Sequence, residues 1–167
     1  MTVTTQAKWS ELVGTLEREL EGLCRLVRLS HRQRRYLIKG DQRRVHANIA
    51  AIEAQLAHLR AANTERQTLL GAIGVTDRGR KGLKSAAAAA DTPWRERIEA
   101  LEAALARVTE LLGRKNFQNH QLSRFSLELV GEEMRLLVGA SESPGTTYDA
   151  EGTAGDPAVR GAVDGRA

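Results

Sequence analysis

Hydrophobic residues recur at helical spacing in the first part of the chain. Over residues 6–39 the steps between apolar positions alternate between three and four, which places one set of side chains on one face of a helix: Trp9, Leu12, Leu16, Leu20, Leu23 and Val27. Charged residues such as Glu17, Glu19 and Arg25 occupy the other faces. This pattern predicts a long amphipathic helix over 6–39.

A second apolar series follows after a short interruption. Gly40 suits the left-handed position after a helix, and Asp41 can cap the next helix by accepting its free amide hydrogens. Over residues 41–73 the heptad spacing continues through five apolar positions: Val45, Ile49, Ile52, Leu56 and Leu59. Asn63 and Arg66 then stand on the same seam as polar interruptions. We therefore expect a tight turn and a second helix over 41–73.

A third helix is expected over 93–138. Its first half is a regular heptad built from six residues: Trp94, Ile98, Leu101, Leu105, Val108 and Leu112. After Leu112 the register weakens, so the spacing leaves open whether the helix continues through 113–119. The stretch 74–92 is basic, rich in glycine and then in alanine, and shows no apolar period, so it is predicted to be a loop. Within it, the alanine run over 86–90 has high helix propensity and either forms a helical turn or stays as linker.

The last part of the chain has a different composition. Residues 140–167 contain no Leu, Ile, Phe or Met and carry a net charge of −3, with five acidic and two basic residues. Such a segment cannot bury enough apolar surface to offset its ordering entropy, so we predict an acidic, disordered tail. The predicted fold is all-α, with a domain over 1–139 in which three long antiparallel helices form a coiled-coil-like bundle.

Composition supports this fold class and limits the compartment. Aromatic residues make up 4% of the 167 residues, and the three prolines lie outside the first two helical patterns, which disfavours a β fold. The single cysteine, Cys24, cannot form an internal disulfide and is expected to be a small core residue. No run of 18 apolar residues and no secretory signal pattern is present. We expect a cytoplasmic protein that does not insert into a membrane.

The sequence contains few residues arranged for chemistry. Phosphate-binding glycine loops, paired cysteines and nucleophile motifs are absent, so we predict no enzyme, no cofactor and no metal site. The four histidines, His31, His46, His58 and His120, are spaced too widely to form a metal pair on one helix turn, and we expect them in solvent. The net charge of +4 is mixed in sign and argues against a nucleic-acid partner. A basic corner over 25–44 nevertheless keeps a second function open, namely coiled-coil oligomerisation or association with nucleic acid. Other interpretations of this corner are a solvated helical surface and a docking patch for an acidic protein.

Apolar residues at the end of the third helix exceed what one heptad seam can bury. They lie on more than one face: Phe117, Leu122, Phe125, Leu129, Val130, Met134, Leu136 and Leu137. One interpretation is a wider core stripe against the other helices. The other is a surface that receives an amphipathic helix from a partner protein, for which Met and Phe are well suited.

Three stretches resemble a known family, the flagellar export chaperones of the hook–filament junction proteins. The first is a Leu-rich helix with a turn and a second helix over 23–73, where Leu37, Gly40 and Asp41 form the turn. The second stretch, over 111–137, resembles an Asn-x-x-Asn-x-x-Leu helix at Asn116, Asn119 and Leu122. The third is similar to a Thr-Tyr-x-x-x-Gly element at 147–152. The order of the three elements is more specific than any one of them.

The resemblance implies a cytoplasmic chaperone that keeps hook-associated proteins soluble and competent for export during flagellum assembly. It also implies that the cargo's C-terminal amphipathic helix binds the end of the third helix of the chaperone. Carried over by position, the cargo-binding residues are Asn116, Phe117, Asn119, Leu122, Phe125, Leu129 and Met134. Tyr148 in the tail element would contact the export apparatus.

Overall fold

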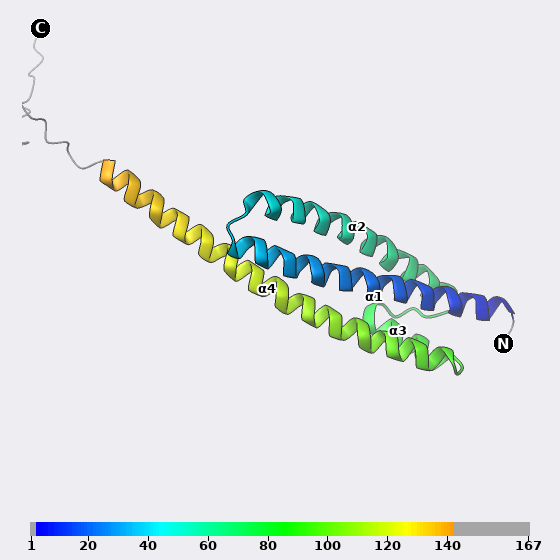
Figure 1. Ribbon diagram of the computed structural model, residues 1–167. Helices are drawn as coiled ribbons and strands as arrows, with labels where there is room; N and C mark the ends of the chain where they lie inside the picture. The colour runs from blue at the N-terminus through cyan, green and yellow to red at the C-terminus, as the bar shows by residue number, and fades with distance from the viewer. Residues whose placement is uncertain (1–2, 142–167) are drawn as a thin grey trace, which may run out of the picture. The chain divides into compact units, whose positions relative to one another are not determined.

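The computed structural model describes residues 3–141 of the chain, and the side chains of residues 6–136. Within this range the chain forms four helices and no strand (Figure 1). Their bounds are α1 Val3–Ile38, α2 Gln42–Ala72, α3 Gly79–Ala89 and α4 Trp94–Ser141. The all-α prediction is therefore confirmed, whereas the expected count of three helices is wrong. Helix α4 is continuous through 113–119, where the sequence pattern weakened.

The turn between α1 and α2 forms as its residues predict. Gly40 adopts a φ of 65°, and its amide donates to the carbonyl of Leu37. Asp41 is the N-cap of α2, because its side chain accepts a hydrogen bond of 3.1 Å from the amide of Arg44. The cap satisfies one of the amide groups that the first turn of a helix leaves without a partner.

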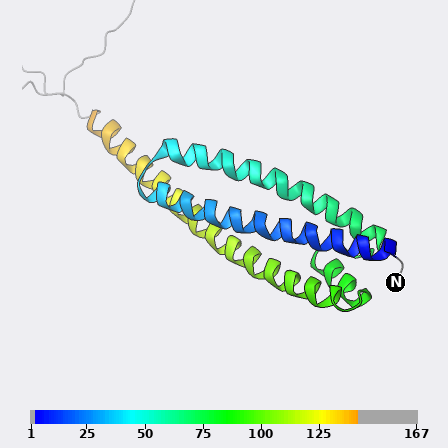
Figure 2. The same ribbon diagram turned by 45° about the vertical axis from the view of Figure 1, so that its right-hand side comes forward.

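Helices α2 and α4 both pack along α1, but in opposite directions. The start of α1 meets the end of α2, where Lys8 Nζ donates to the carbonyl of Ala72 over 2.9 Å. Later in α1, the carbonyl of Leu29 accepts from Asn48 near the start of α2, so these helices are antiparallel. Up to residue 124, helix α4 runs parallel to α1, and Figures 1 and 2 both show this part of it on the side of α1 away from α2. Of the three long helices, α1 and α2 are thus antiparallel, whereas α1 and α4 are parallel.

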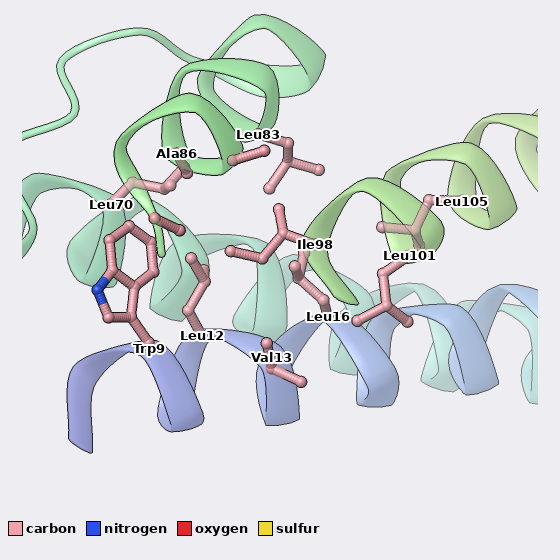
Figure 3. Close-up of a cluster of buried hydrophobic side chains, with 12 residues drawn as sticks. Trp9, Leu12, Val13, Leu16, Leu70, Leu83, Ala86, Ile98, Leu101 and Leu105 are labelled. Atoms are coloured by element: carbon pink, nitrogen blue, oxygen red, sulfur yellow. The ribbon is translucent and has the colours of Figure 1, made fainter. Parts of the chain in front are cut away.

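The hydrophobic core lies where the first half of α1 meets the other helices. It contains four residues of α1, one of α2, four from the alanine-rich segment and three of α4: Trp9, Leu12, Val13, Leu16, Leu70, Leu83, Ala86, Ala87, Ala90, Ile98, Leu101 and Leu105. Figure 3 shows the α1 side chains pointing toward Leu70 and Ile98. The predicted stripe is buried at this end of α1, whereas Leu20, Leu23 and Val27 are half-buried farther along.

Helix α3 corrects the prediction of a loop over 74–92. Its buried residues, Leu83, Ala86, Ala87 and Ala90 beyond its last turn, follow one another at helical steps and close the core beside α2 and α4. The helical spacing of these buried residues could not be recognised in the sequence, because the exposed Ala88 and Ala89 are apolar as well. An alanine run carries no contrast between its buried and exposed faces, although its high helix propensity favours the helix.

The described part of the chain falls into two units, with the boundary between Arg124 and Phe125. The core and the contacts between helices described above belong to the first unit. The predicted boundary at residue 139 lies two residues before the end of α4. The predicted tail lies outside the described residues from position 142 onward.

Candidate functional site

The second half of α4 carries many exposed large hydrophobic side chains. Phe117 and Phe125 are each 64% exposed, Met134 is 59% exposed and Leu129 is 47% exposed. Three further residues of this segment, Leu127, Val130 and Leu136, are also exposed. The alternative of a wider core stripe does not describe these residues, because a core position is buried.

The six exposed side chains between residues 125 and 136 form two stripes along α4 itself. At 100° per residue, Phe125, Leu129 and Leu136 lie within an arc of about 40°. Leu127, Val130 and Met134 form the second stripe, about 150° away around the same helix. A single coiled-coil seam would use one such stripe, so two exposed apolar stripes exceed what a seam buries. Exposed apolar surface of this extent is typical of an interaction site.

Two of the sequence-predicted site residues, the buried Asn119 and the exposed Asn116, form hydrogen bonds with α1. Asn119 is 5% exposed, and its Nδ2 donates to the carbonyl of Ser30 over 2.8 Å and to the Ser30 hydroxyl over 3.1 Å. It also donates to Gln33 Oε1 over 3.3 Å. Asn116 accepts a hydrogen bond of 3.1 Å from the Ser30 hydroxyl. The asparagines therefore hold α4 on α1, and Ser30 is a partner that the sequence pattern did not indicate.

The two remaining sequence-predicted site residues are Leu122 and Tyr148. Leu122 is half-buried, between the exposed Phe117 and Phe125 in the chain. Tyr148 lies outside the described residues. The structure thus leaves Phe117, Phe125, Leu129 and Met134 as the exposed members of the predicted site.

A buried ion pair lies away from this surface, between α1 and α2. Glu19, which the pattern placed on a polar face, is 4% exposed and accepts a hydrogen bond from Arg66 of the α2 seam. Burial raises the pKa of the Glu19 carboxyl above its ordinary value of 4.5, although the Arg66 guanidinium opposes this effect. The pair borders a cavity of about 900 Å³ lined by all four helices. The polar interruption at Arg66 thus has a partner that spacing alone did not reveal.

The other candidate groups do not form a reactive cluster. All four histidines are exposed, and Cys24 is half-buried, not in the core as expected. Among the described residues no group of three potential metal ligands occurs. Nor does any helix in the described part contain an apolar stretch long enough to cross a membrane.

Comparison with known families agrees with the helical architecture. The family model described as FlgN protein matches residues 8–155 of the chain, which is most of its length. The chain belongs to the FlgN family. No curated protein and no solved structure matches it.

The FlgN family comprises flagellar export chaperones for hook-associated proteins. The match extends over α1 to α4 and continues to residue 155. It therefore includes both the exposed apolar segment of α4 and Tyr148. The resemblance to junction-protein chaperones is confirmed, and a role in flagellar export follows from membership of the FlgN family.

Proposed function

We propose that this FlgN-family chain binds hook-associated proteins through the exposed apolar stripes of α4 and keeps them competent for export. The observation that supports the proposal is the set of large hydrophobic side chains that α4 exposes between residues 117 and 136. Flexible Met and planar Phe side chains suit a surface that accepts an amphipathic helix. The C-terminal amphipathic helix of the cargo is the proposed ligand.

Asn116 and Asn119 have a positioning role in this proposal. Their hydrogen bonds to α1 fix the part of α4 that precedes Phe125. The contact residues proper are Phe117, Phe125, Leu129 and Met134, together with the half-buried Leu122. Side chains that are already hydrogen-bonded within the chain contribute less to a new interface than exposed apolar ones.

The expected affinity is moderate. Full burial of one Leu or Phe side chain contributes about 1.5–3 kcal/mol. Association costs about 4–15 kcal/mol in lost freedom, and ordering a cargo helix costs more. Several apolar contacts therefore give a complex that forms in solution and can still release its cargo to the export apparatus. Tyr148 is proposed, from the family resemblance, to contact that apparatus.

Substitution within the first stripe tests the proposal. Phe125→Asp and Leu129→Asp each place a charge where the cargo helix would bury an apolar side chain, so each is expected to abolish binding. Thr109→Asp is the matched control, because Thr109 is an exposed polar residue of the same helix that precedes the exposed apolar segment 117–136. Titration calorimetry with the C-terminal peptide of a hook-associated protein measures binding, and circular dichroism checks helicity. Wild-type affinity in both stripe variants would place the cargo site elsewhere.

A further inference from the structure

The second half of α1 carries a row of cations on one face. Arg28, Arg32, Arg35 and Lys39 follow one another at steps of four, three and four residues. At 100° per residue these positions lie within an arc of about 60°, and they extend over about 17 Å of helix. All four are exposed. These four residues are called the cationic stripe.

Among the described residues, the cationic stripe has no counter-charge. No ion pair or side-chain hydrogen bond involves any of its four residues in the part of the chain that the structure describes. Its neighbours are paired, since Arg25 bonds to Glu21 and Arg44 to Asp41. Like charges three and four residues apart each destabilise a helix by about 0.2–0.5 kcal/mol. An anion bound along the stripe would remove this repulsion.

The stripe also faces away from the helix contacts of α1. Ser30, which bonds to α4, lies about 140° or more around α1 from each stripe residue. Leu29, whose carbonyl accepts from Asn48 of α2, lies at least about 60° from the nearest one. The stripe residues and the α1 positions that bond to α2 and α4 therefore lie on different arcs of the helix.

We propose that the cationic stripe binds the phosphate backbone of double-stranded nucleic acid without sequence preference. Arginine, which supplies three of the four cations, donates two parallel hydrogen bonds to a phosphate. A protein partner would require apolar or aromatic anchors, and a membrane surface would require an apolar face beside the cations. The arc of the stripe contains neither. Single strands are disfavoured because no aromatic residue stands within the stripe for base stacking.

The net charge of the whole chain argues against a nucleic-acid partner, but the charge is unevenly distributed along the chain. The whole chain has a net charge of +4, but residues 1–124 contain 22 basic and 13 acidic residues, a net charge of +9. Affinity for a phosphate backbone depends on the cations that contact it, because each contact releases a condensed counterion. An average over the chain therefore hides a local surface that suits phosphate.

The salt dependence of binding to a DNA duplex tests the proposal. With four phosphate contacts, log K is expected to fall with log salt at a slope of about −3.6. Replacing three cations, as Arg28→Gln, Arg32→Gln and Arg35→Gln together, should weaken binding and reduce the slope to about −1. The control variant combines Arg60→Gln, Lys81→Gln and Lys84→Gln, which changes the net charge equally at exposed residues of α2 and α3. Its slope should stay within about half a unit of the wild-type slope.

Fluorescence anisotropy of a labelled duplex with the full chain provides the measurement. Three outcomes would each overturn the proposal: no duplex binding at low salt, an equal loss in the control variant, or binding of a polyglutamate peptide in preference to the duplex. A stripe variant that retains wild-type helicity by circular dichroism excludes unfolding as the cause of a loss. The assay contains no cargo, so its result is independent of the function proposed for α4.

Discussion

Replacing Asn119 with alanine is expected to lower the free energy of unfolding by about 2 kcal/mol. The Asn119 side chain is almost fully buried and faces three acceptors on α1, at 2.8, 3.1 and 3.3 Å. Its amide has two hydrogens, so it supplies the equivalent of two hydrogen bonds at about 1 kcal/mol each. The carbonyl of Ser30 also lies inside α1 and keeps its helical partner, so the substitution does not leave it without a donor.

Thermal and urea unfolding, followed by circular dichroism, measure this effect. For a chain of this size, a loss of about 2 kcal/mol corresponds to a fall in Tm of about 4–8 °C. Asn116→Ala is the matched control, because Asn116 is exposed and makes one hydrogen bond to the same serine. The control is expected to lose less than about 1 kcal/mol.

Cargo binding separates the positioning role of Asn119 from direct contact. At a temperature where the alanine variant is folded, its affinity for a cargo peptide should stay close to that of the wild type. Unchanged stability together with a large loss of affinity would refute the reasoning, because it would mean that Asn119 contacts the cargo and not α1.

Two further predictions concern packing and pH. Gly82→Ala should destabilise the fold by about 1–3 kcal/mol, because a Cβ there would lie 2.5 Å from the carbonyl oxygen of Asp77. Gly113→Ala is the control, because a Cβ there would meet no atom of another part of the chain within 4 Å, and it should stabilise α4 by about 0.5–1 kcal/mol. Equal effects in urea unfolding would contradict this account. The pKa of Glu19 is raised in the folded state, so the folded state binds the Glu19 proton more tightly than the unfolded state does. The protonated Glu19 therefore stabilises the fold below about pH 4.5, and this contribution is lost as the pH rises through the pKa of the folded state. In urea unfolding, the free energy of unfolding of the wild type should therefore fall relative to that of Glu19→Gln as the pH rises from 4 to about 7. A relative rise would show that the charge of Arg66 affects the Glu19 pKa more than burial does.

The heptad spacing determined where the long helices lie. The predicted ranges 6–39, 41–73 and 93–138 differ from those of α1, α2 and α4 by at most three residues at either end, and the turn at Gly40 and Asp41 has its predicted conformation. Such features are local, because a helix and its cap depend on residues within a few positions of one another. The apolar excess on α4 was also visible in the sequence, since eight large side chains cannot share one seam.

Tertiary structure decided which residues become partners across the helices. Asn119 resembled a recognition residue in the sequence, but it is buried because Ser30, 89 positions away, lies beside it. Glu19 is buried because Arg66 faces it from α2. The alanine run became a helix with a buried face only because α2 and α4 leave space for small side chains beside the core. Spacing along the chain determines which residues share a face, whereas burial and charge pairing depend on what another helix places against that face.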